Sequence, residues 1–147
     1  MGDYEMIITL PSGDAQASGT ASSYTIPLPQ PVNLAYNGYY EVALIDISFS
    51  NPGNTGNSIF VLCDLVDYSI VGSSKVQILY KTEPMVQTAT ALPIYYMKEE
   101  GSLVQWRKLY KNSFNNITVR IQDSTGTPIP SGPSNFATLT IAIKRIR

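Results

Sequence analysis

The sequence contains no histidine and a single cysteine, Cys63. Without histidine it lacks the usual general base, a common metal ligand and the partner that activates a serine or cysteine nucleophile. One cysteine excludes an intrachain disulfide and a cysteine-based zinc cluster. We therefore expect no enzymatic activity, no metal and no other cofactor, and we predict that Cys63 is a small side chain of the core.

Charged residues are scarce as well. They form 14% of the 147 residues, with ten Lys and Arg against eleven Asp and Glu, whereas a typical soluble domain has about 25%. There is no basic tail, and the run "KRIR" at Lys144–Arg147 offers three positive charges, so we expect no specific nucleic-acid binding. A surface with so few charges resists association poorly, and one explanation is that neighbouring subunits cover much of it.

Long apolar runs are also missing. No segment approaches the roughly 18–20 residues of a membrane helix, and the acidic start "MGDYEM" does not resemble a signal peptide. We expect no membrane insertion. A hydrophobic content of 44% is sufficient for one domain with its own core, and we predict a single domain over residues 1–147.

Most of the sequence has the pattern of β-strands. Proline at positions 27 and 29 cannot donate to a β-ladder, so the strand that contains them should lie at a sheet edge. About eight strands joined by long loops predict an all-β protein, an antiparallel two-sheet sandwich and most plausibly a single jelly roll. The predicted strands are residues 3–10, 23–29, 39–50, 58–67, 75–81, 92–98, 116–122 and 136–146.

One predicted strand, "YYEVALIDISFS" over residues 39–50, changes the parity of its apolar positions halfway. Val42 and Leu44 share one face of an extended chain, whereas Ile47 and Phe49 share the other. Such a strand either contains a β-bulge or is buried on both faces. Both explanations make it a central strand with a second face hidden from water, and a neighbouring subunit could cover that face.

One segment, Gly101–Lys111, has apolar residues at helical spacing. Leu103, Trp106 and Tyr110 carry this spacing. The same residues also fit an irregular loop, so the sequence leaves both open.

The groups that could carry chemistry are dispersed. Glu99 and Glu100 are adjacent in a turn rather than convergent. Asp64 and Asp67, which we place on one strand, would lie on opposite faces and make a weak metal site. Asp46 needs a hydrogen bond or a subunit contact. No glycine-rich phosphate loop occurs. We predict no catalytic, cofactor-binding or metal-binding residues.

Three blocks, taken in order, resemble the penton (minor capsid) single jelly-roll proteins of the polinton, virophage and adintovirus lineage. "GYYEVALIDISFS" is similar to that family's G-x-W-E-V-A-L-x-E-I-x-[YF] strand, with Tyr40 in place of Trp. "IFVLCDLVDYSIVGSSKVQILYK" resembles its next block, with Tyr68-Ser69 in place of Pro-Gln. "FNNITVRIQDSTGTPI" with "ATLTIAIKRI" resembles its closing hairpin. The matching positions are Gly38, Glu41, Val42, Ala43, Leu44, Ile47, Phe49, Asp64, Leu65, Val66, Val71, Gly72, Leu79, Lys81, Phe114, Ile117, Val119, Ile121, Asp123, Gly126 and Ile129.

The resemblance implies a structural protein of the virion. Five copies would form a ring at the fivefold vertices of an icosahedral capsid of a double-stranded DNA virus or virus-like element. A double jelly-roll major capsid protein would surround the ring. The loop "PSGPSN" departs from the family's short Phe-and-Gly turn, and no lectin-like domain is inserted.

Two other functions remain open. A β-sandwich binding module, such as a fibre head or lectin-like domain, would use loops and tyrosines to bind glycans or a receptor. A third hypothesis is a small capsid protein that builds a whole shell alone. The absence of a basic arm, which would neutralise the packaged nucleic acid, argues against it.

Overall fold

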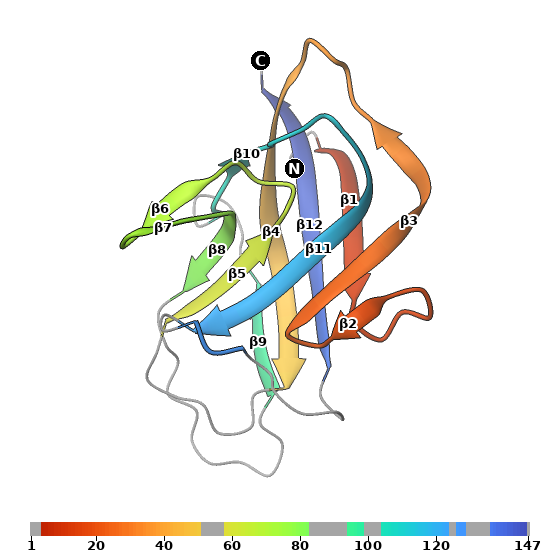
Figure 1. The fold of residues 1–147 in the computed structure, drawn as a ribbon. Coiled ribbons are helices and arrows are strands. Elements are labelled where there is room, and N and C mark those ends of the chain that lie inside the picture. Colours follow the sequence, from red (N-terminus) through yellow and green to blue (C-terminus); the bar gives the residue numbers. More distant parts are fainter. Residues whose placement is uncertain are drawn as a thin grey trace.

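A computed structural model describes residues 4–50, 58–82, 94–98, 104–123, 126–128 and 136–146. These residues contain strands and connecting turns but no helix (Figure 1). Eight of the strands have five or more residues, and four are shorter. The longer strands are β1 (Tyr4–Pro11), β3 (Ser23–Asn33), β4 (Tyr39–Ser50), β5 (Ile59–Cys63), β8 (Ile78–Thr82), β9 (Ile94–Lys98), β11 (Ser113–Asp123) and β12 (Ala137–Ile146); the short ones are β2 (Ser18–Thr20), β6 (Ser69–Val71), β7 (Ser74–Val76) and β10 (Arg107–Lys108).

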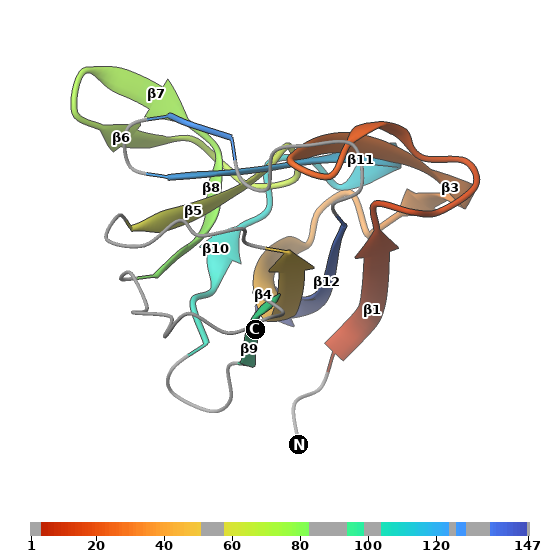
Figure 2. The ribbon, with the colours of Figure 1, turned by 90° about the horizontal axis from the view of Figure 1, so that it is seen from below.

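The strands form two antiparallel sheets and a separate hairpin. Sheet I has the order β1-β12-β4-β10, with β9 also paired to β4, and sheet II has the order β2-β3-β11-β5-β8. β6 pairs with β7 alone. The two sheets lie one above the other (Figure 2), and one apolar cluster draws side chains from both. The chain is thus all-β and antiparallel, as predicted, and the layers are consistent with the expected sandwich.

The core follows the alternation of the last two long strands. Ile117, Val119 and Ile121 of β11, together with Leu139 and Ile141 of β12, are at most 1% exposed. Burying one such aliphatic side chain stabilises the fold by about 1.5–3 kcal/mol. Each of these two strands therefore contributes a buried apolar face to one of the two sheets.

The parity change in β4 is a β-bulge. Leu44 pairs with Ile141 and Asp46 pairs with Thr140, so Ile45 is the extra residue. The bulge restores the inward direction of the later apolar residues, and Ile47 and Phe49 enter the same core as Leu44. The bulge explanation is confirmed, and β4 is central between β12 and the pair β9 and β10.

The predicted strand over residues 75–81 is two strands. Gln77 separates β7 from β8, and its side-chain amide donates to the carbonyl oxygens of Asp64 and Val66 at 3.2 and 2.9 Å. The register between β5 and β8 also shifts at Leu79. Ile78 consequently packs in a small outer cluster while Tyr80 packs in the main core. The prediction of one continuous strand was wrong here, because the Gln77 side chain bonds to the turn after β5 and interrupts the strand.

No helical turn forms in the described part of the helix candidate. Residues 104–106 have no regular secondary structure, and β10 follows, pairing with β4 through Arg107–Val42 and Lys108–Glu41. Leu103 lies outside the described residues. This segment can instead pair with the free edge of β4. Such pairing is favoured because a short isolated helical turn is only marginally stable.

The edge prediction for β3 is confirmed for its second half. The short strand β2 covers only Ser23–Thr25. From Ile26 onward β3 is the outermost described strand of sheet II, and its pairing with β11 is interrupted between Pro27 and Val32. Prolines therefore occupy the part of the strand that has least need of a donor.

A tyrosine joins the sheets at this edge. The Tyr24 hydroxyl on β3 donates to the carbonyl oxygen of Leu10 on β1 at 2.7 Å, and both residues are buried. Burial, with a smaller effect from Cys63, raises the pKa of Tyr24 well above its usual range.

We expect Tyr24→Phe to lower the free energy of unfolding by about 1–2 kcal/mol, because it removes a buried hydrogen bond without creating a cavity. Urea denaturation would measure the change. Tyr39→Phe is the matched control, since Tyr39 is 70% exposed. An equal effect of both variants would show that the bond to Leu10 contributes nothing.

Candidate interaction surfaces

The described residues include the cysteine and three of the acids that the sequence analysis singled out. Cys63 is 2% exposed and packs in the main core, as predicted. Burial raises the pKa of its thiol to about 12, so the thiol is unreactive at neutral pH. Among the described residues no group of three or more His, Cys, Asp or Glu could hold a metal ion. Glu99 and Glu100 lie outside these residues. No helix in the described part of the chain is long and apolar enough to cross a membrane.

Asp64 is a partly buried acid whose carboxylate bonds to the backbone of another strand. β5 ends at Cys63, so Asp64 and Asp67 do not share a strand, contrary to the prediction. Asp64 Oδ1 accepts a hydrogen bond from the Thr118 amide at 3.0 Å. Burial raises the pKa of the Asp64 carboxyl, while that hydrogen bond and the Lys111 charge act against the rise. The carboxylate thus fastens the turn after β5 to the middle of β11.

This pKa direction gives a pH-dependent prediction. A carboxyl whose folded pKa exceeds its unfolded value destabilises the fold once it ionises, so the stability is complete below the unfolded pKa and falls as the pH rises through the folded one. We expect Asp64→Asn to be more stable than the parent protein at pH 7, because the amide oxygen still accepts from Thr118. The gain should vanish near pH 3. Urea denaturation at both values tests this, with exposed Glu5→Gln as control; a gain that persists at pH 3 would contradict it.

One flank of the molecule is closed by backbone hydrogen bonds between the sheets. Leu109 donates to Tyr40 of β4 at 2.9 Å, while the next residue, Tyr110, donates to Leu65 after β5 at 2.7 Å. Gln105 extends the closure, because its side-chain amide bonds both backbone groups of Lys81 on β8, at 3.3 and 2.9 Å. We call this side the closed flank.

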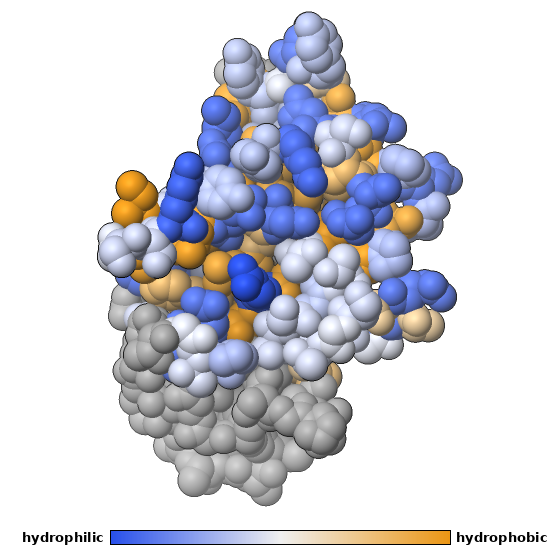
Figure 3. All heavy atoms as spheres, viewed as in Figure 1, coloured by the Kyte–Doolittle hydropathy of each residue, from blue (hydrophilic) through white to orange (hydrophobic). Residues whose placement is uncertain are grey.

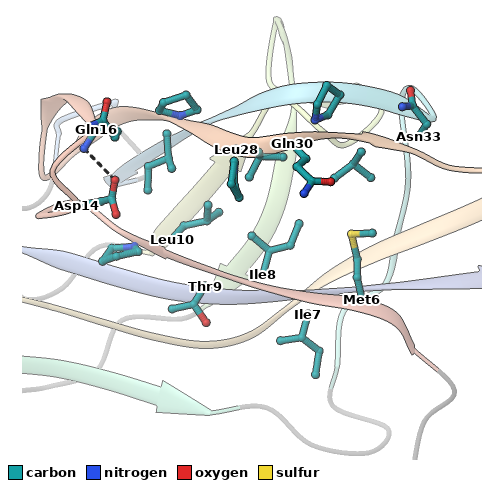
Figure 4. Close-up of a pocket in the computed structure, with 16 residues that line it drawn as sticks. Met6, Ile7, Ile8, Thr9, Leu10, Asp14, Gln16, Leu28, Gln30 and Asn33 are labelled. Carbon is teal, nitrogen blue, oxygen red and sulfur yellow. Dashed lines mark hydrogen bonds between the residues drawn. The ribbon is translucent and has the colours of Figure 1, made fainter.

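The opposite side, where β1 faces β3, is open. A groove of about 970 Å³ runs between these two strands, and Figure 4 shows side chains of both strands projecting into it. Its partly buried apolar residues belong to the edge of the core. Asp14 is the single charged residue of its lining, which also has four prolines. The apolar wall consists of Met6, Ile8, Leu10, Ile26, Leu28 and Val32.

The β6–β7 hairpin projects from the side away from this groove (Figures 1 and 2). Val71 and Val76 pack against Phe60, Leu62 and Ile78 and so hold the hairpin on the outer face of sheet II. Ile70 and its cross-strand partner Lys75 are on the other face of the hairpin, and Ile70 is 80% exposed. Figure 3 shows hydrophobic residues at the margin where this hairpin lies, beside a largely hydrophilic face of sheet II.

Trp106 covers the outer face of sheet I. Its ring lies 5.9 Å from that of Tyr4, and Lys144 Nζ lies 4.1 Å from the indole centroid. Because Arg107 pairs with Val42, Trp106 is next to Ala43 in register, and its ring reaches residues of β12 and β1. Ala43 and its cross-strand partner Ala142 are fully buried although they point outward. The chain's own Trp106 thus lies over part of the outer face of sheet I, where the sequence had suggested a neighbouring subunit.

Trp106 is the only tryptophan, so its fluorescence reports on this contact. We expect Ala142→Leu to lift the indole off the sheet and shift its emission to longer wavelength, because the added atoms occupy the space beneath the ring. Thr138→Leu, on the same face but remote from the cluster, is the control. Identical spectra for Ala142→Leu and the parent protein would place the ring elsewhere.

No protein-family model matches the chain, and a search of curated proteins finds no match either. The sequence analysis predicted neither the groove between β1 and β3 nor the projecting β6–β7 hairpin, because each depends on which strands become neighbours in the fold. A partial signal existed in Val71-Gly72, where Gly72 adopts a φ of +60° at the hairpin turn.

Proposed function

We propose that the chain is a single jelly roll that acts as the pentameric penton at the fivefold vertices of an icosahedral virion, with a double jelly-roll major capsid protein as its neighbour. The pairing order supports the topology. Among the long strands the first pairs with the last, β1 with β12, and β3 pairs with β11. β4 pairs with β9 and β5 pairs with β8. This nesting of antiparallel pairs across two sheets is typical of a jelly roll.

The resemblance to penton proteins rests on residues with definite physical roles. Val42, Leu44, Ile47 and Phe49 enter one core by way of the bulge. Gly38 is required by a close approach, because a Cβ there would lie 2.7 Å from the Tyr40 ring. The shared motif therefore describes a particular bulged strand and its entry rather than mere alternation, which adds weight to the proposed relationship.

The observation that carries the proposal is the difference between the two flanks. Backbone hydrogen bonds close one flank, whereas the other exposes an apolar groove between β1 and β3. A ring with cyclic symmetry needs two unlike surfaces on opposite sides of each subunit. A chain with 14% charged residues also has little electrostatic repulsion to oppose such contacts.

A glycan-binding module is the second candidate, and one polar pocket favours it. A cavity of about 200 Å³ lies beside β5 and β11 and is lined by Asp64, Tyr68, Lys75 and Arg120 among others. Tyr68 packs edge-on against Tyr110 with 5.6 Å between ring centroids. Exposed aromatic rings next to hydrogen-bonding groups suit sugars.

Native mass spectrometry separates the two candidates. For the penton we expect one dominant species of five chains, whose abundance falls with dilution. A heterologous interface of this kind should bury on the order of 1,600 Å² to be stable. A strict monomer or trimer that binds a glycan array would contradict the penton and favour the binding module.

A further inference from the structure

We propose that the β6–β7 hairpin of one copy inserts into the β1–β3 groove of the next copy. This contact rests on the proposed ring and specifies which residues join its subunits. The occupant of the groove is thus a second copy of the same chain, and the knob that fills it is Ile70 with Lys75.

The groove is suited to an apolar knob rather than to an added strand. Leu28 and Val32 on one wall and Met6 and Ile8 on the other are only partly buried. Prolines at positions 27, 29 and 31 leave the β3 wall with few backbone donors. An occupant must therefore gain its affinity from side-chain burial between the walls, at about 25 cal/mol per Å² of apolar area.

The hairpin has the shape, rigidity and chemistry for that role. Ile70 exposes 80% of its surface although it is a large aliphatic residue. Val71 and Val76 fix the hairpin from behind, so little ordering entropy is lost when Ile70 is buried. Gly72 permits the tight turn, because its φ of +60° is in the left-handed region.

Charge sets the direction of the contact. Asp14, at the end of the groove near Leu10, is the only charged residue among those that line it (Figure 4). Lys75, the cross-strand partner of Ile70, is exposed and is the only charged residue of the hairpin 69–76. An apolar contact flanked by one opposite-charge pair fixes the register of the two copies.

The two parts lie on opposite sides of each subunit in both ribbon views. A knob and a groove so placed cannot satisfy each other within a two-fold dimer that uses one shared patch. They repeat head to tail, and the chain of contacts ends only when a ring closes.

Cysteine cross-linking tests the geometry. Cys63 is buried, so Ile70→Cys together with Gln30→Cys supplies the two reactive thiols, one on the knob and one in the groove. We expect a short bismaleimide to give a ladder of covalent species that ends at five chains. Ile70→Cys with Tyr39→Cys, whose second thiol is outside the groove, is the matched control and should give at most traces.

Substitution tests the energetics. Ile70→Asp should weaken assembly on the order of 30-fold or more, as removal of a central apolar anchor does, while the thermal unfolding of the subunit stays unchanged. Asp14→Lys and Lys75→Glu should each weaken it by about fivefold, and the double reversal should restore it. Native mass spectrometry over a dilution series gives the values.

The outcomes distinguish this contact from the ring itself. Pentamers that persist in Ile70→Asp, together with the absence of a ladder from the Ile70→Cys and Gln30→Cys pair, would overturn the hairpin-in-groove contact but would leave the proposed penton unaffected. A ladder that continues beyond five chains would support the contact and contradict the pentamer. A parent protein that stays monomeric at every concentration would overturn both.

Discussion

The unequal closure of the two sheets is the constraint on which the rest of the structure depends. On the closed flank, residues 105–110 donate and accept hydrogen bonds with strands and turns of both sheets. On the open flank, the described link is the Tyr24 hydroxyl bonded to Leu10. The apolar core between two packed sheets is about 10 Å thick, so one tyrosine side chain cannot cover its edge. The part of the edge that stays uncovered is the groove between β1 and β3.

The bulges are what allow one core to serve strands with irregular alternation. Much of the fold was predictable because buried and less buried positions alternate over residues 117–122 of β11 and 137–141 of β12, and because the apolar positions of β4 change parity at its bulge. The break at Gln77 was not predictable, since it depends on the carbonyl groups of residues 64 and 66, which only the fold brings close. The sequence left a helical turn and a loop both open for the Trp106 segment, for a similar reason. Its apolar residues have helical spacing, but the partners of the Trp106 ring, Tyr4 and Lys144, come from strands distant in sequence.

The interaction surfaces were less predictable than the fold. Pro27 and Pro29 correctly indicated an edge strand, yet nothing in the sequence near them says that β1 will face it across an apolar gap. Ile70 is likewise an ordinary strand residue by pattern. Only the packing of Val71 and Val76 on sheet II determines that Ile70 must point to solvent. A low content of charge was the one global signal, and it indicated association without indicating where.

The management of strand edges bears on the kind of association that the protein can undergo. Gln105 occupies the backbone groups of Lys81 on β8, and prolines interrupt the outer half of β3. Both devices prevent uncontrolled strand addition at the edges of sheet II. Sheet I ends at β1, whose described backbone pairs with β12 alone, directly beside the groove. Strand addition is therefore hindered at both described edges of sheet II, while the β1 edge of sheet I lies on the side where the proposed hairpin contact would bury the remaining apolar surface. Hindered strand edges matter for a protein with few charges, because little electrostatic repulsion opposes its aggregation, and the proposed head-to-tail contact would direct association toward a closed ring.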